Sequence, residues 1–424
     1  MATFTTTKPS EEETNKVYDR QIRLWGADAQ RRIQASRVLF LGLGPANVEL
    51  CKNLVLAGFS ATIADHRKVD AASLGYNFFA DAESIGKGAA EASIENIAEL
   101  NPFADVKIGS TSSCTDAATA DALVEGHGVV IIDVPCSKGS EEERRLINEA
   151  CRKSGAKFLA VRCSGDGAAA FLDLGAEHTY VVETGEGAKK TTSAPQKAAY
   201  CSYADASNVA WNDVKNKKMA QPPTPFLLDR LDALFADRPT PKKRSRDEDD
   251  FVAFARRELE ARSLKLDDMI LARHARVAGK CPAHIAAVVG GVLGQEVVKA
   301  VSGRGAPTNN IFAFDAATGA GTALFASPVE RAAAPKRYVS VEDAGHLLPS
   351  DLCAIGADEG GIVEIAERAG LPVPANIRRL GTDGCQEDAL PPEPGWHVVR
   401  DAVTRVLLET FGGLEGAAVL GADI

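Results

Sequence analysis

The chain has 424 residues, of which 45% are hydrophobic and 25% are charged, as expected for a globular protein of roughly two or three domains. Its formal net charge of −10, from 48 basic and 58 acidic residues, argues against a broad nucleic-acid-binding surface. The longest apolar runs, such as Ile285 to Leu293, are too short to cross a bilayer, and residues 1–10 lack the pattern of a signal peptide. We therefore expect a protein that is not exported and that binds no membrane and no nucleic acid.

From residue 37 to about 175, strand-like and helix-like segments alternate. The predicted strands are 37–42, 60–65, 104–109, 128–134 and 156–162, and the predicted helices are 46–57, 88–100, 116–125 and 140–153. This alternation is typical of a doubly wound, mostly parallel sheet with helices on both faces. The sequence thus predicts a Rossmann-like α/β domain whose first part occupies 17–175, after a flexible N-terminus at 1–16.

A tight turn, Gly42-Leu43-Gly44, joins the first strand to the first helix, where folds of this kind bind a nucleotide phosphate. The third glycine of the usual G-x-G-x-x-G motif is replaced by Asn47, and Pro45 removes one amide donor. Asp65 stands about 20 residues further on, as the ribose-binding acid does in dinucleotide-binding proteins. The loop alone is equally compatible with a bound nucleotide and with a turn kept for folding.

Residues 176–270 interrupt the alternation with Pro222, Pro223 and Pro225, a basic run at 242–246 and an acidic run at 247–250. This pattern predicts an insertion that is partly disordered in its middle. The basic run is either solvated surface or a nuclear-import signal. We expect a protein of the nucleus that is also present in the cytoplasm.

Regular structure is predicted again at 271–330, with an apolar helix at 283–300 and a strand at 311–315. Gly290, Gly291 and Gly294 lower the intrinsic stability of that helix by about 1 kcal/mol each, which implies close contact with another backbone. A C-terminal extension at 331–424 has predicted helices at 360–369 and 397–410, and its role does not follow from its composition.

The nine cysteines and seven histidines form no metal-ligand pattern, so we expect reduced thiols and no metal site. Neither Cys163 nor Cys281 has a nearby histidine or a basic helix start that would activate a nucleophile. We interpret most cysteines as small buried hydrophobic residues.

Several segments resemble, in the same order, the ThiF/MoeB-like activating enzymes. They are Tyr18 to Gly26, the degenerate glycine loop, Lys52 to Gly58, Asp65-His66, Leu100-Asn101-Pro102 and Val288 to Lys299. Within that family the chain is most similar to the Aos-type small subunits of SUMO-activating enzymes, notably at Pro307 to Asn310. The resemblance covers 17–175 and 275–330.

This resemblance implies a heterodimer that uses ATP and Mg²⁺ to adenylate a SUMO-like modifier and then passes it to a cysteine as a thioester. The large catalytic subunit performs this chemistry and transfers the modifier to a conjugating enzyme. The small subunit is implied to be regulatory and inactive alone.

Three positions depart from the active members of the family. Arg67 stands where they carry a ribose-binding carboxylate, Tyr76 where they carry a phosphate-binding arginine, and Ser137 where they carry a magnesium-binding aspartate. Asp133, close before Ser137, is not expected to substitute for it. We therefore expect ATP and Mg²⁺ to be bound mainly by the partner, and this chain to hold no cofactor or metal in its degenerate pocket at Gly42, Gly44, Asn47 and Asp65.

By the same resemblance, Arg20 is the catalytic contribution of this chain, a finger that reaches the ATP phosphates in the partner's site. A guanidinium suits that role because it is a planar, permanently charged fork of donors. From the residues alone, the alternative is that Arg20 and Arg23 are surface residues that form ion pairs with Asp19 or Asp28, and this alternative is stronger for Arg23. Trp25 is interpreted as a packing anchor.

Three alternatives stay open. The chain is also compatible with a small subunit for another ubiquitin-like modifier. An NAD-dependent oxidoreductase using Gly42, Gly44 and Asp65 is disfavoured by Arg67. An adaptor that works through its C-terminal extension is the third alternative.

Overall fold

The computed structural model describes residues 10–327, except 111–113, 134–138, 166, 185–190, 216–218 and 239–247, together with two short strands beyond. The chain divides into two units, residues 1–328 and 329–424. Of the second unit, the described residues are the paired strands β13 (Tyr338–Val339) and β14 (Ala418–Val419). The basic run at 242–246 and the helices predicted at 360–369 and 397–410 lie outside the described residues.

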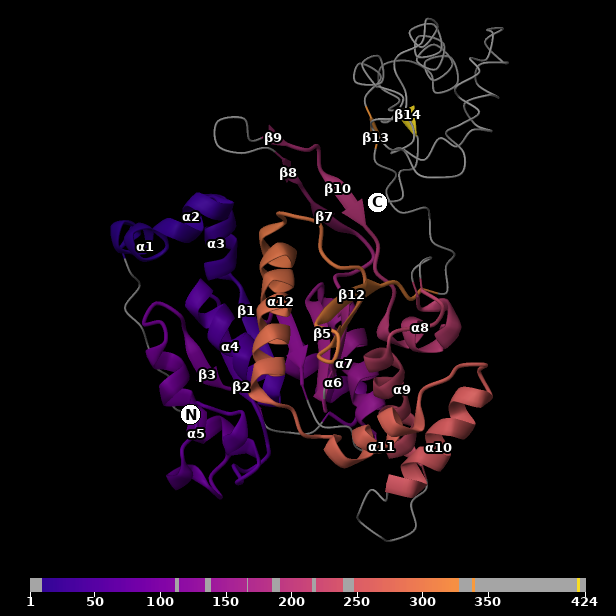
Figure 1. Cartoon of the computed structure of the whole chain (residues 1–424). Helices are drawn as coiled ribbons and strands as arrows, with labels where there is room; N and C mark the ends of the chain where they lie inside the picture. Colours follow the sequence, from indigo (N-terminus) through magenta and orange to yellow (C-terminus); the bar gives the residue numbers. More distant parts are fainter. Residues whose placement is uncertain are drawn as a thin grey trace, which may run out of the picture. The chain divides into compact units, whose positions relative to one another are not determined.

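An eight-stranded sheet forms the centre of the first unit, in the order β12-β11-β6-β5-β4-β1-β2-β3 (Figure 1). The five strands from β3 to β5 are parallel and match the predicted ones: β1 (Arg37–Leu41), β2 (Ser60–Ala64), β3 (Val106–Ile108), β4 (Val129–Ile132) and β5 (Lys157–Ser164). Three antiparallel strands extend it: β6 (Gly167–Asp173), β11 (Ile311–Asp315) and β12 (Ala320–Leu324). The predicted Rossmann-like α/β fold with a mostly parallel sheet is confirmed.

Helices cover both faces of this sheet, and the side chains of β1 show the division. Val38 and Phe40 belong to one buried cluster, and Leu39 and Leu41 to the other. The first cluster is closed by α4 (Pro45–Ala57), α5 (Ala89–Glu99) and α12 (Ala283–Ser302). The second is closed by α6 (Ala117–Val124), α7 (Ser140–Ser154), α9 (Thr224–Asp237), α10 (Glu248–Glu260) and α11 (Asp268–Val277).

Helix α12 packs along α4, as Figure 1 shows, and the contact is closest at Gly290. A Cβ atom on Gly290 would lie 2.5 Å from the Cβ of Glu49, whereas one on Gly291 would meet no atom within 4 Å. The predicted backbone contact is therefore made at Gly290. In the described part of the chain, α12 is the helix that is long and apolar enough to cross a membrane, but its position on the sheet identifies it as a core helix.

The segment predicted as an insertion, 176–270, contributes more to the fold than its sequence suggests. It begins with short paired strands, β7 (His178–Tyr180) with β10 (Gln196–Ala198) and β8 (Glu183–Thr184) with β9 (Thr191–Thr192), followed by α8 (Tyr203–Asn208). Helices α9, α10 and α11 then bury Phe226, Leu231 and Phe251 against the sheet. The prolines of this segment indicate irregular structure, and that interpretation is wrong for two of them. Pro223 and Pro225 lie at the start of α9, where a missing N–H costs little.

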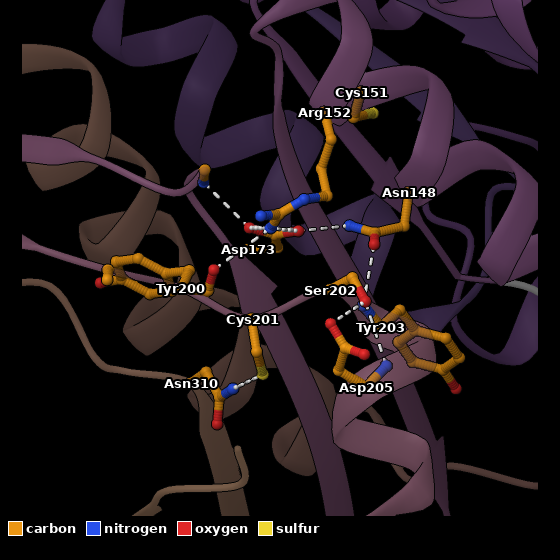
Figure 2. A network of polar contacts seen from close by, with 12 residues as sticks. Asn148, Cys151, Arg152, Asp173, Tyr200, Cys201, Ser202, Tyr203, Asp205 and Asn310 are labelled. Carbon is orange, nitrogen blue, oxygen red and sulfur yellow. Dashed lines mark hydrogen bonds and ion pairs between the residues drawn. The ribbon is translucent and has the colours of Figure 1, made fainter. Parts of the chain in front are cut away.

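A buried polar network joins the start of α8 to α7 and β6 (Figure 2). The carboxylate of Asp173 accepts hydrogen bonds from Arg152, at 2.8 Å, and from Asn148, also at 2.8 Å. The carbonyl oxygen of Asn148 accepts the backbone N–H of Tyr203 at 2.8 Å. Because each of these groups is satisfied, the network fixes the segment that follows β10 onto the sheet.

Three short helices precede β1: α1 (Glu11–Val17), α2 (Asp19–Trp25) and α3 (Ala27–Ala35). Within the segment predicted to be flexible, 1–16, helix α1 has a capping box in which Ser10 and Glu13 satisfy each other's backbone amides. Gly26 has φ of 87° and makes the turn between α2 and α3, a conformation that favours glycine.

Candidate functional site

The glycine loop lies between β1 and α4, as predicted, but a carboxylate of the chain itself fills the space beside it. Asp133 follows β4 and is only 3% exposed. Its Oδ2 atom accepts the backbone N–H of Asn47 at 3.0 Å, in the first turn of α4. A Cβ atom on Gly44 would lie 2.4 Å from the carboxyl carbon of Asp133. The helix N-terminus that would attract a phosphate is therefore occupied by an internal anion.

Asn47, which replaces the third glycine, holds the loop closed. Its side-chain Nδ2 donates to the carbonyl of Gly42 at 2.7 Å, and the residue is fully buried. Burial raises the pKa of Asp133, and the hydrogen bond from the backbone amide of Asn47 offsets only part of this increase. The sequence motif indicated a missing glycine, but it did not reveal that Asp133 takes the place of the ligand.

Asp65 is the second internal anion at this loop. Its Oδ2 accepts the backbone N–H of Leu43 at 2.7 Å and a hydrogen bond from Nη2 of Arg67 at 2.6 Å, and its Oδ1 accepts Nε of Arg67 at 2.9 Å. Burial alone would raise the pKa of Asp65, but the hydrogen bonds and charge of Arg67 outweigh it and lower that pKa. With these donors in place, both carboxylate oxygens are engaged within the chain and are poorly placed to accept a ribose hydroxyl.

Arg67, Tyr76 and Ser137 are the three positions at which the sequence departs from the active members of the family. Arg67 turns onto Asp65, as described. Tyr76 is half-buried against the core that includes α4, and burial raises its pKa. Ser137 lies outside the described residues. The structure thus brings together Gly42, Gly44, Asn47, Asp65, Arg67 and Asp133 at one end of α4.

Arg20 is at the other end of α4. Helix α2 contacts the last turn of α4 through Gln21, whose Nε2 donates to the carbonyl of Leu56 at 3.5 Å. Gln30, in the following helix α3, donates to the carbonyl of Ala57 at 3.0 Å. Since α4 has 13 residues, its two ends are roughly 20 Å apart. An arginine side chain cannot span that distance, so Arg20 does not belong to the pocket of its own chain.

The side chain of Arg20 is exposed and makes no hydrogen bond or ion pair with any residue that the structure describes. The two acids considered as its partners, Asp19 and Asp28, form ion pairs with other arginines. Arg23 bonds to Asp19 at 3.0 Å, and Arg31 bonds to Asp28. These contacts leave Arg20 as a cation directed away from the fold, on the same helix face as Leu24, which is 64% exposed.

A hollow of about 290 Å³ lies between α2, α4 and α12, and α2 contributes Gln21 and Trp25 to it. It is lined by Gln21, Trp25, Asn53, Leu54, Leu56, Ala57, Gly291, Gly294, Gln295 and Val298. Large apolar side chains on the same three helices are exposed, namely Leu24, Leu56, Val288 and Val292. Several exposed apolar side chains on adjoining helices are a feature of protein–protein contacts.

Cys163, one of the two cysteines considered as a nucleophile, is not activated. Cys163 is buried, and a hydrogen bond from Cys281 together with burial holds its pKa well above the ordinary value. A thiol in such a setting is a poor nucleophile. Among the described residues there is also no group of three or more His, Cys, Asp or Glu side chains that could hold a metal ion.

Comparison with known proteins shows the family of the chain. The sequence matches the ThiF family over residues 18–334. It is 34% identical over 340 residues to SUMO-activating enzyme subunit 1 of Bos taurus, across 74% of this chain and 94% of that protein. The proteins of the same name from Homo sapiens and Danio rerio are 34% and 33% identical with the same coverage. The chain therefore belongs to the ThiF family, together with the proteins named SUMO-activating enzyme subunit 1.

Proposed function

We propose that this chain is a subunit of a SUMO-activating enzyme, and within it the non-catalytic small subunit. In this proposal a large partner binds ATP and Mg²⁺, adenylates the SUMO-like modifier and passes it on to a conjugating enzyme. The small subunit completes the adenylation site of that partner with Arg20. The relatives support the first statement, because they cover most of this chain at about one-third identity.

The observation that carries the non-catalytic assignment is the internal anion at the helix N-terminus. A triphosphate beside α4 would meet the carboxylate of Asp133 at the amide of Asn47, and its ribose would meet Asp65 already paired with Arg67. Two carboxylates repel a polyphosphate, and the cation beside them, Arg67, is already paired with Asp65. The residues of this pocket do not fit ATP.

The position of Arg20 supports its role in another chain. It is exposed, far from its own glycine loop, and lies on the same helix as the exposed Leu24. A guanidinium fork placed on a polyphosphate stabilises the charge that develops in the transition state. Arginine fingers in other phosphoryl-transfer systems contribute about 10³-fold to 10⁵-fold in rate.

ATP–pyrophosphate exchange tests the non-catalytic assignment. The purified chain with ATP, Mg²⁺ and SUMO should give no exchange above background, and adding a large subunit should produce it. Exchange by the chain alone, at a rate that the large subunit does not increase, contradicts the proposal.

Localisation to the nucleus, and also the cytoplasm, is proposed on the basic run at 242–246 alone.

A further inference from the structure

Helix α2 is fixed at both of its ends by hydrogen bonds to the last turn of α4. At its start, the hydroxyl of Tyr18 accepts a hydrogen bond from Nδ2 of Asn101 at 2.8 Å, and the same amide donates to the carbonyl of Val55 at 2.7 Å. Tyr18 is 1% exposed. This first anchor joins the residue before α2 to α4 through one side-chain amide.

The second anchor is at the end of the helix. Nε1 of Trp25 donates to Oε1 of Gln30 at 2.9 Å, and Nε2 of Gln30 donates to the carbonyl of Ala57 at 3.0 Å. Gln30 is 1% exposed. The carbonyls of a last helical turn lack partners within the helix, and the second anchor supplies one to Ala57. The carbonyl of Val55 also accepts the N–H of Gly58, so the first anchor adds a second hydrogen bond there.

Both anchors meet at Gly58, directly after α4. A Cβ atom there would lie 3.1 Å from the hydroxyl of Tyr18 and 3.1 Å from Nε2 of Gln30, and its φ is 104°. Any other residue would push the two anchors away. The convergence of two side chains from different segments on one glycine shows how closely α2 is fitted to α4.

The anchors matter because α2 has little else to hold it. It has seven residues, none of them buried, and a helix of that length is unstable by itself. Arg20 lies between the two anchors. A catalytic group has to be held within a fraction of an ångström of its working position, and its supporting residues supply that precision.

We propose that Asn101 and Gln30 are positioning residues for Arg20. Through Tyr18 and Trp25 they set the place and direction of α2, so that the guanidinium is already aligned when the partner binds. This inference rests on the proposed function, since it assumes that Arg20 acts in the partner's site. The adenylation rate would then depend on the buried side-chain amides of Asn101 and Gln30, although neither amide contacts a phosphate.

The test is a double-mutant cycle in the assembled heterodimer. Tyr18→Phe removes the acceptor of the first anchor, and Gln30→Met breaks the second with little change of volume. Each is combined with Arg20→Ala, and adenylation is measured as the kcat and KM of ATP–pyrophosphate exchange, with the Kd of assembly measured separately. Arg23→Gln, which breaks only an exposed ion pair on the same helix, is the control.

We expect each anchor variant to lower kcat about 10-fold, with KM for ATP and the Kd of assembly within about 2-fold of the unsubstituted protein, because misplacement of about 1 Å costs up to about 100-fold. In the Arg20→Ala background the same substitutions should cause no further loss, since residues that act through one group are not additive. Arg23→Gln should leave kcat unchanged. Trp25→Phe takes the place of Gln30→Met should that variant not assemble.

The outcomes separate this inference from the proposed function. If Arg20→Ala leaves the rate unchanged, the proposed function itself fails. If Arg20→Ala slows the reaction but the anchor variants do not, or if their effects multiply with that of Arg20→Ala, Asn101 and Gln30 are structural residues only and the inference is overturned.

Discussion

The N–H of Asn47 donates to the carboxylate of Asp133 across 3.0 Å, at the position where a nucleotide-binding fold of this type holds a phosphate. The chain thereby satisfies its own helix N-terminus and leaves no vacancy there for a ligand. Asp65 and Arg67 do the same for the neighbouring amide of Leu43. Arg20, the residue proposed to act in the partner's site, lies at the opposite end of α4.

Asp133→Ala should destabilise the protein by about 2 to 4 kcal/mol, because it leaves the buried amide of Asn47 without an acceptor and creates a cavity. The free energy of unfolding in urea measures this. Asp133→Asn keeps an oxygen acceptor and should lose less than half as much. Equal stability of the Ala variant and the unsubstituted protein would contradict an internal anion that stabilises the loop.

Arg67→Ala should cost about 3 kcal/mol at pH 7.5, because it leaves Asp65 buried and charged without its partner. Arg67 lowers the pKa of Asp65, so the stability it contributes is present above the ordinary carboxyl pKa and is lost as the pH falls through the lowered one. Without Arg67 that pKa rises. The cost of Arg67→Ala should therefore shrink toward pH 4.5, as urea unfolding at both pH values would reveal.

Arg23→Ala provides the comparison for that experiment. Its ion pair with Asp19 is exposed on both sides, and such pairs contribute little. A loss of about 0.5 kcal/mol or less is expected at either pH. A loss from Arg67→Ala as small as this, or one that does not depend on pH, means that Asp65 does not depend on Arg67.

His178 gives the fold a dependence on acid. Burial lowers the pKa of His178 to about 4 in the folded protein, whereas a histidine in the unfolded chain has a pKa near 6.5. Between these two pH values the ring is neutral in the folded state and protonated in the unfolded state. Stability contributed by the neutral ring is present above pH 6.5 and falls as the pH drops toward 4. The protein should lose about 1.5 kcal/mol between pH 6.5 and pH 5 from this residue. His178→Phe should remove that part of the dependence, whereas His66→Gln, at an exposed site, should retain it.

Gly290→Ala and Gly291→Ala form a matched pair in α12. At Gly290 the new methyl group would lie 2.5 Å from Glu49, and separating α12 from α4 should cost about 1 to 3 kcal/mol. At Gly291 there is no atom within 4 Å, and alanine should stabilise the helix by up to about 1 kcal/mol. Thermal unfolding of the two variants should shift in opposite directions. Shifts of the same sign and size would mean that Gly290 is not a contact point.

The elements with strong periodicity were predictable from the sequence. Strands such as β1 and β4 are short apolar runs that alternate along the chain with helix-like segments, and stops such as Gly58 and Asn101-Pro102 separate them. Strand β6 was not predicted, because its run of alanines has low strand propensity and becomes a strand only by pairing with β5 and β11. Tertiary packing also explains α9, because the prolines near its start indicated a break in regular structure when the sequence was considered alone.

For the site, the sequence predicted which residues would lie together but not how they are satisfied. Gly42, Gly44, Asn47 and Asp65 are near one another in sequence, so a strand-turn-helix unit brings them together by itself. Asp133 comes from a strand about 90 residues away, and its bond to Asn47 depends on β4 lying beside β1. The anchors Gln30 and Asn101 carry no chemical signature, and only their buried contacts identify them.

The most direct test of the account is the adenylation rate of the heterodimer with Arg20→Ala in this chain. Single-turnover formation of the SUMO adenylate should fall by about 10³-fold or more, with the Kd of assembly within about 2-fold. Arg20→Lys should restore only part of the rate, because an ammonium group lacks the planar fork. A rate for Arg20→Ala equal to that of the unsubstituted heterodimer, or a loss of rate matched by an equal loss of assembly, would contradict the central claim that this chain lends Arg20 to its partner's site.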